Sequence, residues 1–418
     1  MTGERVAVIG AGVSGLTAAY LLRNRYHVRM FEAAAKPGGH ADTHDVRTPD
    51  GRTLAIDTGF LVHNETTYPT LVRLFRELSV RTNDTEMSLS VRCTGCGLEY
   101  AGGKRRKGMI PGGGHAVLRP YLGMLGEIGR FYRSARALLH APDERRTLHD
   151  VLVSGRYSPY FVEHFAIPLV STVWSAGATD TLRYPAAHLF TFLKNHGMLS
   201  PTGSLRWRTV VGGARTYVER IVAALPEVLA GAPVRTVRRH FDGIDVVTAD
   251  GAMYRADRVV VATHADQALR MLADPMPEEK RVLGAFRYTR NETWLHRDAT
   301  VLPSRRRTRA AWNYVRSSCM AGSAGLVSYD INRLMGLGTA VDHIVTLNGA
   351  ATVDEATVIA KMRYEHPLYT PSAVAAQPRL RHLGGPRTAY AGAYHGWGFH
   401  EDGCVSGVRA AAAFGATW

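Results

Sequence analysis

Val6-Ala-Val-Ile9 runs directly into Gly10-Ala-Gly-Val-Ser-Gly15, and Val28-Arg-Met-Phe31 follows and ends on Glu32. The two short apolar runs predict strands, while the glycine-rich segment and the residues after it predict a tight turn and a helix. Strand, glycine turn, helix and strand in this order are typical of the βαβ unit that binds dinucleotides. The first 32 residues therefore predict a nucleotide-binding fold.

Each glycine of this turn has a separate role in such a unit. Gly10 allows the tight turn, Gly12 lets the backbone approach a pyrophosphate, and Gly15 lets the helix pack close to the strand. Glu32 stands where a carboxylate accepts hydrogen bonds from a ribose diol. The pyrophosphate is expected at the helix N-terminus, where free amide groups carry partial positive charge.

Length and composition restrict the class of protein. At 418 residues the chain exceeds the size at which single cores stop growing, so two domains are expected. A hydrophobic content of 45% and a charged content of 21% are ordinary globular values. We expect no membrane span, because no run approaches 18 apolar residues, and no signal peptide. Four cysteines fit a reducing compartment, so the prediction is a cytoplasmic protein.

The chain is strongly basic, with 51 Lys and Arg against 36 Asp and Glu, a net charge of +15. Two dense runs contribute, Lys104-Arg-Arg-Lys107 and Arg305-Arg-Arg307, the latter followed by Arg309. Solvated loops explain such runs. The alternatives are docking to an anionic membrane surface or to an acidic carrier, and nucleic-acid binding. We expect no nucleic-acid partner, because no binding module accompanies the charge and no aromatic residues interleave the runs.

A second nucleotide fingerprint is missing. Gly112-Gly-Gly114 follows Ile110-Pro111 rather than a strand and lacks the required spacing, so we interpret it as a loop. An enzyme that binds both FAD and NAD(P)H in separate Rossmann domains would show two fingerprints. The sequence therefore predicts a single bound dinucleotide.

The predicted fold class is α/β, with a discontinuous Rossmann-type domain and an inserted α+β substrate domain. Residues 1–78, 210–275 and 386–418 are assigned to the nucleotide-binding domain, and 79–209 and 276–385 to the substrate domain, as a largely helical insert plus a second sheet. The predicted helices are 68–78, 118–139, 147–154, 159–169, 216–225 and 403–414. The predicted strands are 53–56, 233–237, 244–248, 253–255, 258–262, 292–296, 310–315, 326–332, 343–347 and 389–394.

Several further motifs follow the fingerprint in a familiar order: Gly38-Gly39, Asp57-Thr-Gly59, Gly212-Gly213 and the glycine-rich closing segment. Together with the GxGxxG turn and Glu32, they resemble the flavin-containing amine oxidoreductase superfamily, which includes monoamine oxidases, protoporphyrinogen oxidase and phytoene desaturases. This resemblance covers nearly the whole chain. It implies an amine-oxidase-like fold and FAD as the cofactor.

A narrower resemblance rests on Asn195-His-Gly197, on Ala262-Thr-His-Ala-Asp-Gln267 and on the segment from Gly392 to Gly403. These stretches are similar to a bacterial branch often encoded beside cyclopropane fatty acid synthases. A similar flavoprotein forms the N-terminal half of the plant cyclopropane fatty acid synthases. This branch implies a fatty acyl or modified lipid chain as the substrate.

The resemblance also implies cofactor contacts at particular positions. One departure is His40, where many amine oxidases have arginine after the paired glycines, so phosphate neutralisation is left to backbone amides. The implied FAD contacts are Gly10, Gly12 and Gly15 (phosphates), Glu32 (ribose), Gly38, Gly39 and His40, Thr58 and Gly59, Val234 (adenine), Thr263 (adenosine), Glu401, Asp402 and Gly403 (ribityl chain and pyrophosphate), and Ser406 at the final helix.

Hydride removal needs a C–H bond placed over the flavin, often with a base for a neighbouring proton. His63 and His400 are the candidate catalytic residues, with structural hydrogen bonding as the alternative for each. Aromatic and polar residues near these two histidines are interpreted equally well as the wall of a substrate cavity or as ordinary core packing. The same two interpretations apply to Trp312 and Asn313. The candidate substrate contacts are Trp174, Asn195, His196, Tyr314, Tyr394 and Trp397.

Cys93-Thr-Gly-Cys96 has the spacing of a redox or metal-binding pair. Cys319 and Cys404 are isolated in the sequence, so four-thiolate spacing fails. We interpret the pair as a coincidence in a loop and expect no metal, with a disulfide or half of a metal site as alternatives.

These features favour an FAD-dependent oxidoreductase that carries out two-electron dehydrogenation or desaturation of an apolar organic substrate, such as a fatty acyl or modified lipid chain. One alternative is an amine oxidase that releases hydrogen peroxide. The other is a flavoprotein without net redox turnover, acting as an isomerase or as the partner of a lipid methyltransferase.

Overall fold

The structure is a computed structural model that describes residues 3–103, 108–111, 115–200 and 205–418. The basic run Lys104–Lys107 and the predicted loop Gly112–Gly114 lie outside the described residues. Arg305–Arg307 are exposed. No helix in the described part of the chain is long and apolar enough to cross a membrane.

A five-stranded parallel sheet forms the nucleotide-binding half, in the order β10-β2-β1-β14-β20. Its strands are β1 (Arg5–Ile9), β2 (His27–Phe31), β10 (Glu227–Leu229), β14 (Arg258–Val261) and β20 (Thr388–Tyr390). The central strand β1 is apolar because both of its faces are covered, as in other parallel sheets. Val6 and Val8 pack into one core, and Ala7 and Ile9 pack into the core on the opposite face.

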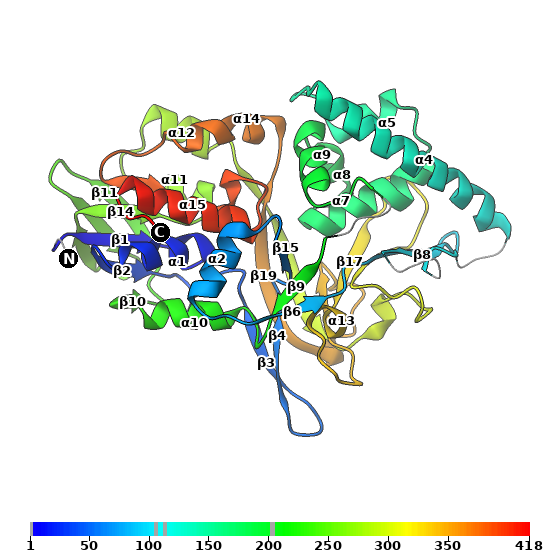
Figure 1. Cartoon of the computed structure of the whole chain (residues 1–418), viewed down its shortest axis with the longest axis horizontal. Helices are drawn as coiled ribbons and strands as arrows, with labels where there is room; N and C mark the ends of the chain where they lie inside the picture. Colours follow the sequence, from blue (N-terminus) through cyan, green and yellow to red (C-terminus); the bar gives the residue numbers. More distant parts are fainter. Residues whose placement is uncertain (1–2, 104–107, 112–114, 201–204) are drawn as a thin grey trace.

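Helices α1 (Val13–Leu22), α2 (Pro69–Glu77), α10 (Arg215–Ala223) and α15 (His400–Ala413) belong to the first of these cores. Helices α1 and α15 lie side by side (Figure 1). A Cβ at Gly407 would lie 2.3 Å from the backbone oxygen of Ser14, so this close contact requires glycine. The helix pair holds the carboxy-terminal segment against the phosphate-binding turn.

The opposite face of the sheet is covered by a three-stranded meander and three short helices. The meander consists of β11 (Val234–Arg239), β12 (Ile244–Thr248) and β13 (Met253–Ala256). The helices are α11 (Ala265–Met271), α12 (Pro277–Leu283) and α14 (Pro371–Leu380). Helices α12 and α14 differ from the sequence interpretation, which placed both segments in the substrate domain. Their apolar residues complete the core under the nucleotide-binding sheet instead.

The second sheet has seven strands in the order β19-β15-β18-β17-β16-β7-β8. They are β7 (Leu89–Cys93), β8 (Glu99–Gly102), β15 (Arg287–His296), β16 (Trp312–Arg316), β17 (Gly325–Asp330), β18 (Ile344–Leu347) and β19 (Val358–Leu368). Strand β7 pairs with β16 in parallel register, with Cys93 opposite Arg316. This pairing joins the two segments predicted for the substrate domain into one sheet.

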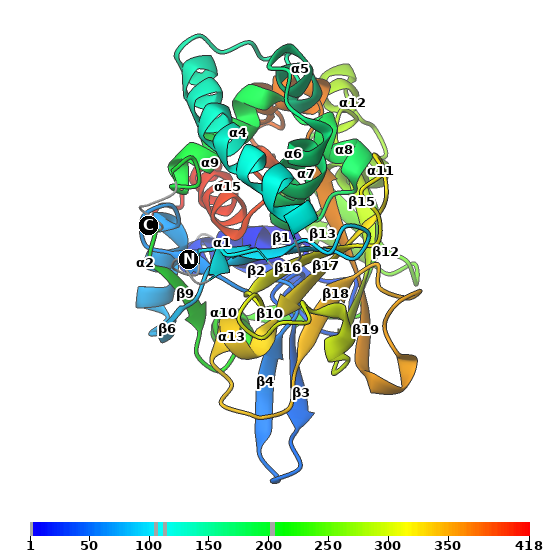
Figure 2. The same cartoon turned by 90° about the vertical axis from the view of Figure 1, so that its right-hand side faces the viewer.

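The helical insert lies above this sheet and away from the nucleotide-binding half (Figures 1 and 2). It comprises α4 (His115–His140), α5 (Leu148–Ser154), α6 (Pro159–Phe161), the π-helix η1 (Val162–Ala166), α7 (Ile167–Trp174), α8 (Ala178–Leu182) and α9 (Ala186–Asn195). Phe131 contacts the rings of Phe161 and Phe190 edge-on or tilted, which forms an aromatic centre for the insert.

Small elements connect the two halves. Strands β3 (Thr43–Arg47) and β4 (Thr53–Asp57) form a hairpin that projects from the body in Figure 1. Strands β5 (His63–Asn64), β6 (Thr82–Thr85) and β9 (Trp207–Val210) form a three-stranded sheet. Helix α13 (Ile331–Met335) follows β17, and the 3-10 turns are Ala299–Val301, Glu355–Thr357 and Ala393–His395.

Candidate cofactor and substrate site

A cavity of about 960 Å³ extends from the glycine turn of the nucleotide-binding half to the second sheet and the helical insert. Its volume lies at the upper end of the usual range for small-molecule pockets. One part is lined by Gly10, Gly12, Glu32 and Gly39, and another by apolar and aromatic side chains from α7, α9 and β16–β18. Both predicted parts of the site, cofactor and substrate, thus border one continuous space.

The phosphate-binding turn is built as the glycine spacing predicts. Gly10 has a φ of +98°, and a Cβ there would lie 2.7 Å from the backbone oxygen of Ala262. A Cβ at Gly15 would lie 1.9 Å from the backbone oxygen of Gly10. Gly12 differs, because a Cβ there would meet no heavy atom within 4 Å, yet the residue lines the cavity as the N-cap of α1. The space beside Gly12 and the free amides of the helix start fit a phosphate group.

Glu32 joins the end of β2 to this turn. Its carboxylate accepts the backbone N–H of Ala11 at 2.7 Å and that of Ala34 at 2.8 Å. A carboxylate has about four acceptor positions, so two remain for ribose hydroxyls. Glu32 lines the cavity, as its predicted role requires.

Gly38 and Gly39 bring a second loop against the turn. Gly38 donates its N–H to the backbone oxygen of Ala11 at 2.9 Å and has a φ of +133°. Gly39 has a φ of +58°, and a Cβ there would lie 3.2 Å from the Cα of Gly12. The two glycines therefore permit a close backbone approach next to the expected pyrophosphate.

His40 follows these glycines and lines the cavity. Its ring lies 4.9 Å from Tyr364 and 5.2 Å from His366, measured between ring centroids. Burial, together with the neighbouring His366 and His264, holds the pKa of His40 well below its usual value. The imidazole is therefore neutral at pH 7, and its Nε2 has no hydrogen-bond partner among the described residues. It does not replace the positive charge of the family's arginine.

The Asp57-Thr58-Gly59 turn lies beside His40. Thr58 Oγ1 and the hydroxyl of Tyr364 are 2.6 Å apart, and a Cβ at Gly59 would lie 2.3 Å from the backbone oxygen of His40. Asp57 itself is buried, accepts the Thr43 hydroxyl and the Ala214 N–H, and has its pKa raised to about 7 by desolvation. Thr58 and Gly59 line the cavity.

Val234 and Thr263 border the cavity at the side expected for the adenosine. Thr263 lies two residues after the end of β14, at the carboxyl edge of the parallel sheet, as the glycine turn does. Ligands bind at this edge in open α/β sheets. Val234 begins β11 on the neighbouring meander.

The start of α15 differs from the sequence prediction. Glu401 accepts the N–H groups of Thr70 and Leu71, both at 2.9 Å, in the first turn of α2. Asp402 accepts the N–H of Phe399 at 2.9 Å, and burial raises its pKa to about 7.

Gly403 and Ser406 also face away from the cavity. A Cβ at Gly403 would lie 2.6 Å from Val13 Cγ1, and Ser406 accepts the N–H of Gly392. None of the four predicted contacts from Glu401 to Ser406 lines the cavity, whereas Gly398, Phe399 and His400 do. Successive helical residues point in different directions, so the cavity contacts predicted for Glu401 to Ser406 fall instead on the first residue of α15 and the two residues before it.

The two candidate catalytic histidines differ in their position relative to the cavity: His400 lines it, whereas His63 lies behind Phe60. His400 lines the cavity and stacks on Phe60, and burial together with His63 lowers its pKa to about 3. Its Nε2 is buried and has no hydrogen-bond partner among the described residues. His63 is buried behind Phe60 against Phe75 and does not line the cavity. Desolvation lowers the pKa of His63 to about 4.

Only Tyr394 among the six candidate substrate contacts lines the cavity. Trp174 donates its Nε1 hydrogen to the backbone oxygen of Trp397, and Trp397 donates to that of His188, each at 3.2 Å, so both support the wall from behind. Asn195 is exposed, and Tyr314 is buried in the core.

His196 is buried and packs against a lining residue. Its ring stacks on Phe192 with centroids 3.9 Å apart, and its Nε2 lies 3.0 Å from Thr67 Oγ1. It therefore supports Phe192 without lining the cavity itself.

The apolar part of the cavity is formed mostly by residues that sequence reasoning did not assign to the site. The sequence left open whether Trp312 lines the cavity or packs in the core, and the structure places it in the cavity wall. The others are Thr172, Val173, Phe192, Met198, Trp207, Tyr329 and Leu347. Tyr329 lies opposite Trp312 in the β16–β17 register, so the pairing of two strands would have found it.

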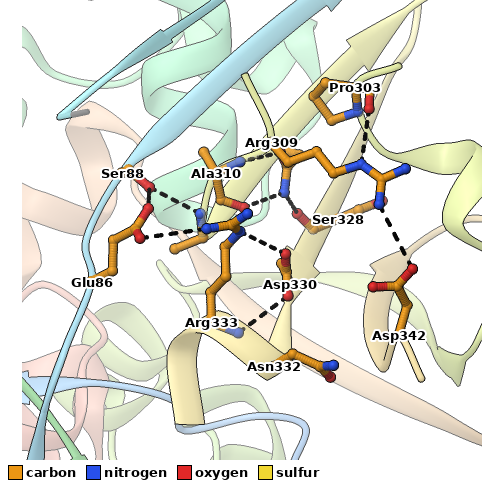
Figure 3. A network of polar contacts seen from close by, with 12 residues as sticks. Glu86, Ser88, Pro303, Arg309, Ala310, Ser328, Asp330, Asn332, Arg333 and Asp342 are labelled. Carbon is orange, nitrogen blue, oxygen red and sulfur yellow. Dashed lines mark hydrogen bonds and ion pairs between the residues drawn. The ribbon is translucent and has the colours of Figure 1, made fainter. Parts of the chain in front are cut away.

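A polar network fixes the strand ends that carry these two aromatic residues (Figure 3). Ser88 accepts the N–H of Ala311 with its hydroxyl and that of Trp312 with its backbone oxygen. Arg333 forms ion pairs with Asp330 at 2.9 Å and with Glu86 at 3.6 Å. The network holds β7, β16 and β17 together immediately beside the cavity wall.

A parallel sheet with a glycine turn, an acid at the end of the second strand and a cavity beside both is typical of dinucleotide-dependent enzymes. Residues 13–291 match the family described as flavin containing amine oxidoreductase, and the chain belongs to this family. It is accordingly an FAD-dependent oxidoreductase. The α/β fold predicted from the glycine fingerprint is confirmed.

The comparisons with individual proteins agree on the fold. Cyclohexylamine oxidase from Brevibacterium oxydans IH-35A aligns with a TM-score of 0.71 at 16% identity, over 99% of this chain and 98% of that chain. A CLA-producing fatty acid isomerase from P. acnes aligns with a TM-score of 0.65 at 14% identity, over 97% of each chain. Protoporphyrinogen oxidase 2, chloroplastic/mitochondrial, from Arabidopsis thaliana is 58% identical over 40 residues, a match that spans 9% of this chain and 8% of the plant protein's own length.

Proposed function

We propose that this enzyme removes two electrons from an apolar, chain-like substrate, as a dehydrogenation or desaturation. The observation that carries the proposal is the second part of the cavity. The lining residues from α7, α9 and β16–β18 include no acidic or basic side chain, and they present Phe192, Trp312 and Tyr329 to the space. A site of this composition favours the burial of hydrocarbon over the burial of a charged group.

FAD, when bound, accepts the two electrons from a carbon–hydrogen bond. The chain's own residues align the substrate and exclude water from the reacting carbon. His400 lines the cavity, and its neutral Nε2 is buried without a hydrogen-bond partner among the described residues. It is therefore the histidine best placed to hold or transfer a proton of the substrate. His63 contacts Phe60 on the side away from the cavity and so supports the stack of Phe60 and His400.

An amine oxidase is the first alternative, and one structural neighbour carries that activity in its name. A cationic amine would need a carboxylate or an aromatic cage at the reacting end. The acidic residues among those lining the cavity are Glu32 and Glu365, both outside the apolar wall. A neutral amine could still enter, so hydrogen peroxide release on amine addition tests this alternative.

An isomerase without net redox turnover is the second alternative, favoured by the fatty acid isomerase among the structural neighbours. It shares the proposed substrate class but leaves the flavin oxidised at the end of each cycle. The analogous partner role, beside a lipid methyltransferase, would also leave the flavin unchanged.

Anaerobic mixing separates these functions. A fatty acid, a phospholipid and a primary amine are added separately to the purified, yellow enzyme while flavin absorbance is recorded. Bleaching by a lipid chain supports the proposal. Bleaching by the amine alone, or double-bond migration in the lipid without bleaching, contradicts it.

A matched pair of variants tests the apolar wall. Phe192→Asp places a carboxylate in the space and is expected to lower flavin reduction by lipid at least about tenfold, because burial of a charge is unfavourable. Phe192→Leu retains the apolar surface and is expected to retain most of the rate. Both should remain yellow, because Phe192 lies outside the nucleotide-binding half.

We further propose that the substrate is delivered at an anionic membrane surface. Met109, Ile110, Leu118 and Leu122 are exposed by 46%, 57%, 40% and 56%, and Leu118 and Leu122 lie one helical turn apart on α4. In the sequence they follow the basic run Lys104–Lys107. Apolar and basic residues together are typical of peripheral membrane binding. Co-sedimentation with phosphatidylglycerol vesicles, reduced for Leu122→Glu and absent with phosphatidylcholine vesicles, is the expected result.

A further inference from the structure

Four potential metal ligands meet at one edge of the helical insert, far apart in sequence. Cys93 ends β7, Cys96 lies in the turn that leads to β8, His164 belongs to η1, and Cys319 lies in the loop after β16. One ligand atom from each of these residues lies within 4.8 Å of all the others. The cysteine pair that looked coincidental in the sequence therefore has two further ligands in space.

The separations fit a single tetrahedral ion. Cys93 Sγ and Cys319 Sγ are 3.5 Å apart, and His164 Nε2 lies 3.7 Å from Cys96 Sγ and 3.7 Å from Cys319 Sγ. Tetrahedral zinc with ordinary Zn–S and Zn–N bonds requires sulfur–sulfur distances of about 3.8 Å and sulfur–nitrogen distances of about 3.6 Å. A polynuclear iron–sulfur cluster would hold its ligands farther apart, because they bind different iron atoms.

The turn that carries the cysteine pair is held in a defined conformation. Cys93 donates its N–H to Leu98 at 2.8 Å, Gly97 donates to the backbone oxygen of Cys93 at 2.9 Å, and Gly97 has a φ of +77°. A Cβ at Gly95 would lie 3.0 Å from the backbone oxygen of Ser317. The turn is therefore pressed against the loop that presents Cys319.

His164 is oriented as a metal ligand would be. Its Nδ1 lies 2.9 Å from the backbone oxygen of Tyr160, so Nδ1 carries the hydrogen and Nε2 is the free acceptor that faces the sulfur atoms. A backbone carbonyl on the second nitrogen is the usual outer partner of a metal-bound histidine. The residue lies in a π-helical turn, a feature that is frequent at functional sites.

Arg316 fixes the third ligand segment. Its guanidinium is fully buried, forms an ion pair with Glu163 at 2.6 Å, and donates to the backbone oxygens of Ser318 and Met320. Glu163 precedes His164, and Ser318 precedes Cys319. A single buried cation thus ties together the two segments that carry these ligands.

We infer that Cys93, Cys96, His164 and Cys319 bind one zinc ion in a closed, structural Cys3His site. Binding forms three Zn–S bonds and one Zn–N bond and releases three thiol protons to solvent. All four positions are taken by protein, so no place remains for a water or substrate. Cys319 is exposed, which gives the ion a path of entry.

The ion would clamp two elements that also reach the cavity. Strand β16 runs from Trp312 in the cavity wall to Arg316 beside the cluster, about 13 Å at the usual rise of a strand. The helix from His164 continues through α7 to Val173, also in the wall. The site therefore fixes the helical insert on the second sheet at a distance from the flavin.

Metal analysis of the purified holoenzyme tests the inference without an activity assay. We expect about one zinc per chain, retained after dialysis against a weak chelator. Cobalt substitution should give the intense visible bands of tetrahedral thiolate coordination, at longer wavelengths than the flavin absorbs. Protein with neither zinc nor zinc-binding capacity, with iron instead, or with a Cys93–Cys319 disulfide found by mass spectrometry would overturn the assignment.

Variants supply the matched comparison. Cys96→Ser and His164→Ala should each lose most of the zinc and lower the unfolding temperature. Cys404→Ala is the control, because Cys404 on α15 is buried against Thr17 of α1, outside the cluster. This variant should keep its zinc. If Cys96→Ser and His164→Ala both retain full zinc, the ion is bound elsewhere and the inference fails.

Discussion

The imidazole of His400 stacks on the ring of Phe60, with centroids 3.7 Å apart and planes inclined by 16°. Phe60 follows the Asp57-Thr-Gly turn and His400 begins the last helix, so the stack joins two motifs that lie 340 residues apart in the sequence. Both rings line the cavity. The orientation of the His400 nitrogens therefore depends on Phe60.

We predict that His400→Phe separates the role of the ring from that of its nitrogen. The variant keeps an aromatic ring to stack on Phe60 but has no Nε2. It should bind FAD and yet reduce it about 10² to 10⁴ times more slowly with substrate, as expected for loss of a general acid or base. Anaerobic stopped-flow absorbance measures the rate. A rate within about threefold of the parent would assign His400 to packing alone.

Phe60→Leu is the complementary control. It removes the stacked ring and keeps the nitrogen, so we expect a smaller loss of rate. Because the pKa of His400 is lowered to about 3, this residue stays neutral from pH 5 to pH 8 and should produce no break in the rate profile there.

A second prediction concerns the open space at Gly12. Gly12→Ala should fold with an unchanged unfolding temperature when FAD is absent, because the backbone conformation suits alanine and no atom lies within 4 Å of the new Cβ. That methyl group would occupy the approach of the pyrophosphate, so FAD affinity should fall at least about tenfold. Gly177→Ala changes another helix N-cap with open space around it and should leave FAD binding intact.

Glu401 provides a third prediction, because the sequence assigned it to the cofactor, whereas in the structure its carboxylate accepts hydrogen bonds from the first turn of α2. Glu401→Gln weakens two charge-assisted hydrogen bonds at a helix N-terminus and should cost about 1–2 kcal/mol in the free energy of unfolding. FAD content should not change. Loss of the yellow colour in folded protein would instead support direct cofactor contact.

Local spacing explains which parts of the molecule were predictable. The turn around Gly10, Gly12 and Gly15 depends on steric demands within a few residues, so the sequence predicts it in detail. The direction of Glu401 depends on how α15 is rotated against α1 and α2, and these contacts join residues more than 300 positions apart. No short pattern records such a rotation.

The same reasoning applies to the metal ligands and to the cavity wall. Cys93 and Cys96 are recognisable as a pair, but His164 and Cys319 join them only through the β7–β16 pairing and the buried Arg316–Glu163 contact. The long edge strand β19 was missed, although it places Tyr364 and His366 beside His40. Residues between chemically conspicuous motifs thus formed much of the site.

The last prediction concerns acid stability. Burial lowers the pKa values of eleven of the described histidines. For seven of them the value falls to about 3 (His400) or to about 4 (His63, His164, His188, His296, His366 and His395). The unfolded chain takes up protons at these residues from about pH 6.5 downwards, and the folded chain does so only near pH 4. Their contribution to stability is complete above pH 6.5 and is lost as the pH falls towards 4.

Asp57 and Asp402 act in the opposite direction, because their pKa values are raised to about 7, and folding binds protons at both between about pH 4 and pH 7. The histidines outnumber them, so the net expectation is a falling unfolding temperature from pH 6.5 to pH 4.5. His188 is half-buried between Tyr369 and Trp397, and its pKa is lowered by desolvation, so His188→Gln should make this fall shallower. The exposed His149→Gln should leave it unchanged. Thermal unfolding of the holoprotein at several pH values measures the slope, and a constant or rising temperature on acidification would show that these histidines are not buried in the neutral form.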